Sequence, residues 1–170
     1  MYILQFDGML CSRSLEHIQP QELLGFGWLI QKNGIEIAHG FGIYACRDSV
    51  GSSFAEYLAL LEGLEALTDL QIWGETIEVQ GDAKCVIDQM LGIASVSSLP
   101  LRNLYRHAQA MTQRFHSLTW VWMPRNKNKQ ADMLSRRGLR YLNHSSPARV
   151  APNKESMIPL VDLRVHSHPI

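Results

Sequence analysis

The chain has 170 residues, of which 46% are hydrophobic and 19% charged, and its formal net charge is zero, which is typical of one soluble globular domain. No apolar run is long enough to cross a membrane and no secretion signal opens the chain, so we expect neither a membrane protein nor a secreted one. Three widely spaced cysteines, Cys11, Cys46 and Cys85, argue against a zinc knuckle or a disulfide framework and favour a reduced, cytoplasmic setting.

The first half of the chain is predicted to form an antiparallel meander and one helix. Its elements are, in order, a strand over 1–7, a loop over 8–24, strands over 25–32 and 35–46, and a helix over about 53–69. The loop is predicted because Ser12, Ser14 and Pro20 interrupt that segment. Asn33-Gly34 is typical of a tight hairpin turn, and leucines at helical spacing give the helix one apolar face.

The second half alternates strands and helices. Its elements are a strand over 75–81, a helix over 83–91, a serine-rich connector over 93–100, a helix over 101–115, a strand over 118–123, a basic loop over 124–127 and a helix over 128–141. A leading meander followed by β-α-β crossings predicts an α/β fold. We therefore expect a mixed five-stranded sheet with the element order βββαβααβα and helices packed on its faces.

The chain changes character after Leu142. Prolines at 147, 152, 159 and 169 interrupt a run without periodicity, which predicts an extended or partly disordered tail. We therefore divide the chain into a domain over 1–142 and a tail over 143–170. The apolar patch Ile158-Pro159-Leu160-Val161 could pack on the domain or on a protein partner.

Four acidic residues stand at the edges of predicted elements: Asp7, Glu56, Asp82 and Asp132. Each has an ordinary structural explanation. Ser53 and Glu56 have the spacing of a capping box, in which Glu56 only satisfies a backbone amide. Asp7 could open a turn, Asp82 could cap the next helix, and Asp132 could favour a helix amino end.

Together the four acidic residues match a known order of motifs. The chain contains, in sequence, Phe6-Asp7-Gly8, then Ala55-Glu56-Tyr57-Leu58-Ala59-Leu60, then Gly81-Asp82-Ala83, then Asn128-Lys129-Gln130-Ala131-Asp132-Met133-Leu134. This series resembles ribonuclease H type 1, and most closely its compact subgroup without the basic protrusion or the active-site-loop histidine. The resemblance covers roughly residues 1–142 and implies the ribonuclease H-like fold.

The resemblance also implies an activity, which is hydrolysis of the RNA strand of RNA–DNA hybrids to leave 5′-phosphate and 3′-hydroxyl ends. Two divalent cations about 4 Å apart support such a reaction. Mg²⁺ is the expected ion, with Mn²⁺ as an alternative, since both prefer oxygen ligands. As the resemblance implies, Asp7 would bridge the two ions, Glu56 and Asp82 would complete one, and Asp132 the other.

Contacts with the nucleic acid are expected from six further residues: Gly8, Ser52, Ser53, Arg125, Lys127 and Asn128. The family carries an asparagine just before the Ala-Glu pair, where this chain has serines of shorter reach. Selectivity for a hybrid is therefore less firmly implied than hydrolysis. Arg125 and Lys127 could contact a phosphate or belong to a plain solvated loop.

Charge is unevenly distributed along the chain. Residues 51–100 carry eight acidic side chains and one lysine, whereas residues 101–140 carry nine Lys and Arg and one aspartate. A basic block can follow a phosphate backbone beside an acidic block that supplies metal ligands, although two solvated helix faces of opposite sign would look the same. The alternatives are a non-catalytic module that binds nucleic acid or protein, and another nuclease or strand-transfer enzyme of the same superfamily.

Overall fold

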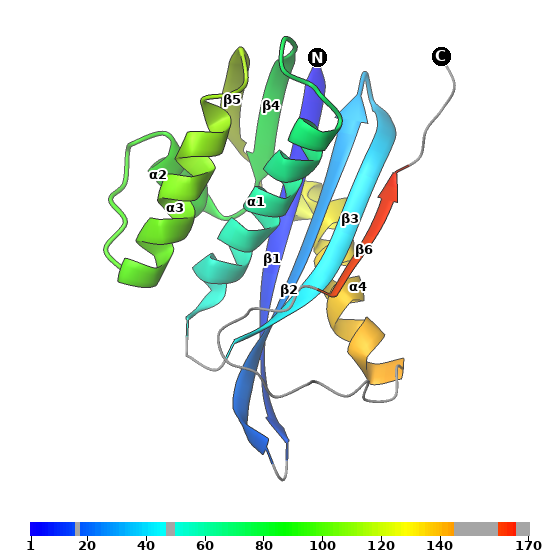
Figure 1. The fold of residues 1–170 in the computed structure, drawn as a ribbon, viewed down its shortest axis with the longest axis vertical. Helices are drawn as coiled ribbons and strands as arrows, with labels where there is room; N and C mark the ends of the chain where they lie inside the picture. Colours follow the sequence, from blue (N-terminus) through cyan, green and yellow to red (C-terminus); the bar gives the residue numbers. More distant parts are fainter. Residues whose placement is uncertain (16–17, 47–49, 145–159, 166–170) are drawn as a thin grey trace.

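The computed structural model describes residues 1–15, 18–46, 50–144 and 160–165. Its strands form one mixed sheet in the order β5-β4-β1-β2-β3-β6 (Figure 1). The strands are β1 (Tyr2–Leu15), β2 (Ile18–Lys32), β3 (Ile35–Cys46), β4 (Thr76–Gly81), β5 (Ser117–Trp122) and β6 (Leu160–Val165). The helices are α1 (Ser52–Asp69), α2 (Lys84–Met90), α3 (Leu99–Thr112) and α4 (Lys129–His144), with a 3-10 turn, η1, over Arg125–Lys127. The five predicted strands form a mixed sheet in the predicted element order, which is confirmed, and β6 adds a sixth strand.

Helices cover both faces of the sheet. In Figure 1, α1 to α3 lie in front of it and α4 lies behind. The main core lies under α1, where β-strand residues such as Leu4, Phe6 and Trp28 pack with Tyr57 and Leu64 of the helix. No helix within the described ranges is long and apolar enough to cross a membrane.

Two glycines of β2 let α4 approach the other face of the sheet closely. A Cβ atom at Gly27 would lie 2.4 Å from the backbone nitrogen of Ser135, and one at Gly25 would lie 2.5 Å from the Ser135 carbonyl oxygen. Any side chain at these positions would push the helix outward. The glycines therefore set Ser135 of α4 next to the middle of the sheet.

The pairing of β1 with β4 determines where two of the acidic residues lie. The strands run parallel, and Phe6 pairs with Gly81 at the end of the ladder. Asp7 and Asp82 follow these two residues, so they emerge side by side. The parallel ladder ends at this point although β1 itself continues to Leu15, and the carboxyl ends of parallel ladders are where α/β proteins commonly bind ligands.

The predicted loop over 8–24 is wrong. β1 continues to Leu15, and β2 begins at Ile18, so this segment forms a long hairpin in which Cys11 pairs with Leu23. In Figure 1 the hairpin extends below the helices. The β1–β2 pairing itself satisfies the backbone groups of this segment, and β3 adds a third strand beside β2 as far as the Glu22–Cys46 pair.

A sixth strand, which was not predicted, closes the β3 side of the sheet. β6 runs antiparallel to β3, with Leu160 paired with Ile43 and Val165 with Ala38. The last helix continues to His144, two residues beyond the predicted end of the domain. The rest of the tail, including Ile158 and Pro159 of the apolar patch, lies outside the described residues. The division at residue 142 and a protein partner for the tail stay predictions.

Candidate active site

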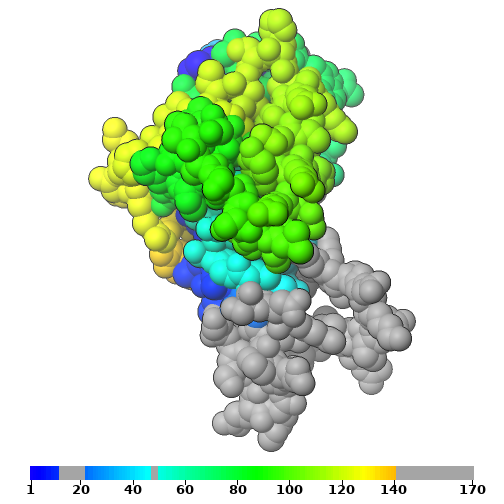
Figure 2. Space-filling model, turned by 90° about the vertical axis from the view of Figure 1, so that its left-hand side faces the viewer, coloured from blue at the N-terminus to red at the C-terminus, as the bar shows by residue number. Residues whose placement is uncertain are grey.

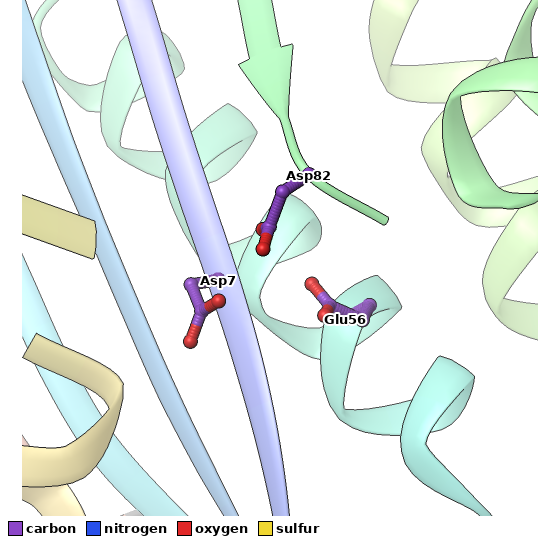
Figure 3. A group of neighbouring side chains, drawn as sticks. All are labelled: Asp7, Glu56 and Asp82. Carbon is purple, nitrogen blue, oxygen red and sulfur yellow. The ribbon is translucent and has the colours of Figure 1, made fainter. Parts of the chain in front are cut away.

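Three carboxylates converge where the parallel ladder between β1 and β4 ends. Asp7 comes from β1, Glu56 from the first turns of α1, and Asp82 from the bend after β4. One oxygen of each lies within 4.8 Å of one oxygen of the others, and Figure 3 shows Glu56 and Asp82 pointing toward each other beside Asp7. Asp7 is buried and the other two are partly exposed, so solvent reaches the cluster from the side of Glu56 and Asp82.

The backbone of Gly8 fixes α1 against β1. The Gly8 N–H donates a 3.0 Å hydrogen bond to the Glu56 carboxylate, and a Cβ atom at position 8 would lie only 2.1 Å from the Ala55 carbonyl carbon. The first residue before α1 is Gly51, and no side chain caps this helix. The capping-box explanation for Ser53 and Glu56 is therefore wrong, because Glu56 binds the backbone of the neighbouring strand.

Asn128 ties the two aspartate-bearing strands together from behind. It is fully buried, and its amide donates to the Phe6 carbonyl oxygen at 2.8 Å and to the Asp82 carboxylate at 2.9 Å. The residue before α2 is Ala83 and no side chain caps that helix, so the capping explanation for Asp82 is also wrong. The Trp122 indole donates to the Asp82 carbonyl oxygen at 3.1 Å and adds a second restraint on this bend.

Asp7 and Glu56 bind protons more tightly than ordinary carboxylates. Burial raises the pKa of Asp7 from 3.8 to about 6, with the charges of Asp82 and Asp132 adding to it and the Ser135 hydrogen bond opposing it. Burial also raises the pKa of Glu56 well above its usual value, and the charges of Asp7 and Asp82 act in the same direction. The cluster is thus costly to ionise without a compensating cation.

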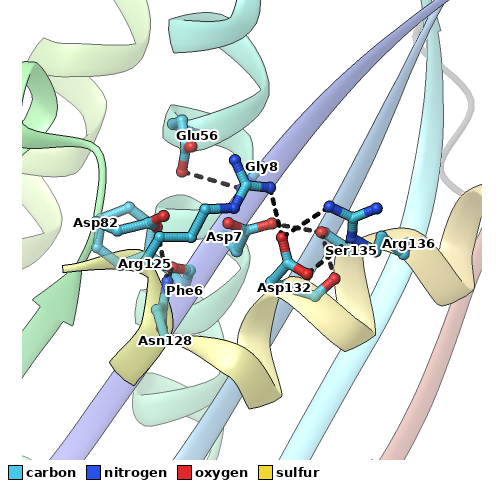
Figure 4. A network of polar contacts seen from close by, with 10 residues as sticks. All are labelled: Phe6, Asp7, Gly8, Glu56, Asp82, Arg125, Asn128, Asp132, Ser135 and Arg136. Atoms are coloured by element: carbon cyan, nitrogen blue, oxygen red, sulfur yellow. Dashed lines mark hydrogen bonds and ion pairs between the residues drawn. The ribbon is translucent and has the colours of Figure 1, made fainter. Parts of the chain in front are cut away.

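Asp132 lies near this cluster but is not part of it. In the first turn of α4, it pairs with Arg125 at 2.5 Å and with Arg136 at 2.7 Å (Figure 4). These contacts, led by the hydrogen bond from Arg136, hold the pKa of Asp132 below its usual value. The position at a helix amino end is confirmed, whereas convergence with the other three carboxylates is not observed.

Ser135 and Arg136 belong to the site and were not predicted. The Ser135 hydroxyl donates a short hydrogen bond to the Asp7 carboxylate and also lies 3.0 Å from the Asp132 carbonyl oxygen. These residues follow Asp132 by three and four positions. Residues at that spacing share one face of a helix, so the sequence contained the signal that could have identified them.

The six predicted substrate contacts fall in different places. Gly8 lines the cluster, Ser52 is exposed, and Ser53 places its hydroxyl 3.5 Å from the Cys85 sulfur. Arg125 and Lys127 are exposed on the 3-10 turn, but Asn128 is interior. In Figure 2 the cyan start of α1 lies near the blue β1, the yellow segment leading into α4 and the green α2–α3 region. A substrate role for these residues stays a prediction.

The donor set at the cluster suits a hard divalent cation. Asp7, Glu56 and Asp82 supply oxygens, the ligands that Mg²⁺ and Mn²⁺ prefer, and their mutual repulsion is the cost that such an ion would remove. Asp132 fits less directly, since its carboxylate would have to exchange an arginine for an ion. The residues therefore fit one cation as they stand and a second only after Asp132 is released.

Comparison with protein families gives a match over most of the chain. The family model described as "Reverse transcriptase-like" matches residues 19–138. The Bifunctional protein Rv2228c of Mycobacterium tuberculosis is 34% identical over 104 residues, which are 61% of this chain and 28% of that protein. An uncharacterized protein of Mycobacterium bovis, Mb2253c, matches to the same extent. The match thus spans about 28% of the length of these curated relatives.

Solved structures give a matching architecture. RNase H1 from the halophilic archaeon Halobacterium salinarum superposes with a TM-score of 0.69 at 26% identity, covering 82% of this chain and 98% of that one. The N-terminal RNase H domain of Rv2228c from Mycobacterium tuberculosis gives 0.69 at 24% identity, covering 84% and 95%. LC11-RNase H1, in complex with an RNA/DNA hybrid, gives 0.70 at 22% identity, covering 84% and 99%. The last two show the fold alone.

Proposed function

Since the chain belongs to the reverse transcriptase-like family and has the ribonuclease H-like fold, we propose that it is a metal-dependent endonuclease that hydrolyses the RNA strand of RNA–DNA hybrids. The products would carry 5′-phosphate and 3′-hydroxyl ends. The single observation that carries this proposal is the convergence of Asp7, Glu56 and Asp82 within 4.8 Å. Such a cluster is costly unless a cation neutralises it.

Mg²⁺ is the proposed cofactor, with Mn²⁺ as an alternative, and Asp7, Glu56 and Asp82 would hold the first ion. Bound divalent ions would activate a water and stabilise charge on the phosphate and the leaving oxygen. A two-ion mechanism would use Asp132 as a ligand of the second ion. For that role, the Asp132 carboxylate must leave Arg125 or Arg136.

The surrounding residues keep the carboxylates in place. Gly8 donates its N–H to Glu56, Asn128 donates to Asp82, and Ser135 donates to Asp7. The bonds to Glu56 and Asp7 favour the ionised carboxylate, which is the form that binds a cation. Preorganised ligands of this kind lower the cost of assembling the reactive arrangement.

Positive charge beside the cluster would attract the nucleic acid. Arg125 lies on the exposed turn before α4, and its guanidinium reaches Asp132. Arginine matches the geometry of a phosphate oxygen pair, so the same group can contact the substrate once Asp132 is released. Lys127 on the same turn is exposed and would add to the attraction.

The test is a cleavage assay with labelled RNA–DNA hybrid, single-stranded RNA, duplex RNA and duplex DNA, each with magnesium, manganese or chelator. Cleavage of the hybrid that needs metal and spares duplex DNA is the expected result. Asp82→Asn serves as the matched control, because the amide keeps an oxygen that can accept the Asn128 hydrogen bond. Binding without cleavage under either metal would instead support a non-catalytic module.

A broader nuclease of the same superfamily is the second candidate, and one observation favours it. Ser52 and Ser53 occupy the place before the Ala-Glu pair where the resembling family carries asparagine. Ser53 lies 3.5 Å from Cys85, and a serine reaches less far toward a 2′-hydroxyl, the group that distinguishes RNA from DNA. Equal cleavage of hybrid and duplex RNA in the same assay would support this reading.

A further inference from the structure

A small hollow lies between β1 and α4. Its volume is about 160 Å³, and it is lined by Met9 of β1 and by Arg136, Leu139 and Arg140 of α4. We call it the basic hollow, because two of its four lining residues are arginines and none is acidic. Two guanidinium groups beside two apolar side chains suit a compact anion.

The position of the basic hollow follows from the strand geometry. Met9 follows Asp7 by two residues on β1, so the two side chains leave the same face of the sheet about 7 Å apart. Gly25, the pairing partner of Met9, allows Leu139 to pack closely, because a Cβ atom there would lie 2.8 Å from the Leu139 side chain. The hollow is therefore built from residues that the fold holds in place.

Arg136 connects the basic hollow to the site. Its guanidinium pairs with Asp132 at 2.7 Å and also lines the hollow. Arg140 lies one helical turn further on and is exposed; among the described residues, no ion pair involves it. A cation outside any described ion pair, beside a partly neutralised one, leaves the hollow with net positive charge.

We propose that the basic hollow binds a backbone phosphate of the strand being cut, next to the phosphodiester at the three carboxylates. This inference rests on the proposed function. Phosphates of one strand rise about 3.4 Å each along a duplex axis, so the step from Asp7 to Met9 corresponds to one or two nucleotides. Arg140 makes the contact directly, and Arg136 joins it when Asp132 turns toward a cation.

The experiment measures hybrid affinity in chelator, where no cutting occurs, as a function of salt. Arg140→Gln should weaken binding about tenfold, the order expected for one charge-assisted contact. It should also lower the slope of log K against log salt by about 0.9, the value for one phosphate. Arg137→Gln is the matched control, because it makes the same charge change on the same helix. The Arg137 guanidinium lies over the Phe41 ring, 4.6 Å from its centre, and the variant should stay within about twofold of the parent.

Two outcomes would overturn the inference. Equal losses in Arg140→Gln and Arg137→Gln would mean that α4 attracts nucleic acid only through its overall charge. Parent-like affinity and slope in Arg140→Gln would mean that no phosphate enters the hollow. Cleavage by the parent protein in magnesium tests the proposed function separately. If the parent cuts the hybrid and Arg140→Gln binds it as tightly as the parent does, the phosphate site is rejected and the proposed function is kept.

A second measurement locates the phosphate without relying on affinity alone. A DNA strand with a short central ribonucleotide block, paired with complementary DNA, fixes where cutting occurs. Phosphates of its deoxy flank are then replaced, one at a time, by uncharged methylphosphonates. The parent should cut more slowly at one or two flank positions only, and Arg140→Gln should show no further loss at those positions. A flat profile in the parent would contradict a bound flanking phosphate.

Discussion

The three-carboxylate cluster and Asp132 are neighbours, since Ser135 contacts both Asp7 and Asp132, yet their electrostatic surroundings are opposite. Asp7 and Glu56 are surrounded by like charges and low polarity, which raises the pKa of both. Asp132 is held by two arginines, which lowers its pKa. The same chemical group is therefore repelled by its neighbours in one place and attracted by two arginines in the other.

The difference indicates how the site would respond to a cation. At the cluster, a divalent ion removes an existing cost, so binding there should stabilise the protein. At Asp132, an ion must displace a guanidinium that already neutralises the carboxylate. We therefore expect the cluster to bind metal more tightly than any site that uses Asp132. The following predictions test this contrast in order of decreasing size.

The largest effect is expected from Asp82→Asn. It removes one charge from the cluster and should lower hybrid cleavage at least about 1000-fold, the equivalent of several kcal/mol of lost charge stabilisation. In chelator the variant should melt no lower than the parent, because repulsion is relieved. Magnesium at a hundredfold excess over its dissociation constant should stabilise the parent by about 2.7 kcal/mol and the variant much less. Equal magnesium-dependent shifts in melting temperature would rule out Asp82 as a ligand.

The second prediction concerns pH and the metal-free protein. The pKa of Asp7 is raised from 3.8 to about 6 in the folded state, so the folded protein binds this proton more tightly than the unfolded chain. Its contribution to stability is complete below about pH 4 and is lost as pH rises through about 6. The full shift corresponds to at most roughly 3 kcal/mol.

Chemical unfolding in chelator between pH 4 and 8 measures this contribution. Asp7→Asn, which cannot ionise, should flatten the pH dependence of the unfolding free energy relative to the parent. Glu56 should keep a share of the slope, since its pKa is raised as well. Parallel curves of unfolding free energy against pH for the parent and Asp7→Asn would show that the pKa of Asp7 is not raised in the folded protein.

A smaller effect is expected from the cations on the Asp132 side. Arg125→Ala and Lys127→Ala should each weaken hybrid binding several-fold and lower the salt slope by about 0.9, if each contacts one phosphate. Fluorescence anisotropy at several salt concentrations provides the measurement. Slopes identical to that of the parent in both variants would place this turn away from the nucleic acid backbone.

The smallest effect is expected from Arg136→Gln on stability. The Arg136 side chain is 41% exposed, and exposed ion pairs contribute less than about 1 kcal/mol. Melting temperature should therefore fall only slightly, and less still in high salt, which screens the pair. A loss comparable to that of a core substitution would mean that Arg136 supports the fold rather than the site.

The sequence identified the cluster because each carboxylate follows a local pattern. Asp7 ends an apolar run and Asp82 follows a strand-like run, and these two runs form neighbouring parallel strands. Glu56 lies in the first turns of a helix with an apolar face. The resemblance supplied the link between these distant motifs. Asp132 was placed correctly at the start of α4, but its pairing with Arg125 and Arg136 depends on side-chain positions that spacing alone left ambiguous.

The missed features share one physical cause, which is long-range pairing. β1 and β2 pair with each other past Ser12 as far as Leu15–Ile18, whereas β3 lines β2 only from Glu22 onward. β6 joins the sheet through backbone hydrogen bonds to β3, and such bonds depend little on side-chain identity. Local composition predicts turns and tails well, but it does not show which distant segment of the chain a strand will pair with.

Gly8 has a consequence for anyone who would transfer this site to another scaffold or diversify it by mutagenesis. A methyl group there would overlap the α1 backbone, 2.1 Å from the Ala55 carbonyl carbon. Alanine scanning treats such a position as conservative, yet here it would move the helix that carries Glu56 away from the strand that carries Asp7. Libraries that keep the acidic residues and vary position 8 should therefore yield few functional clones, and grafts should copy the strand–helix spacing along with the ligands.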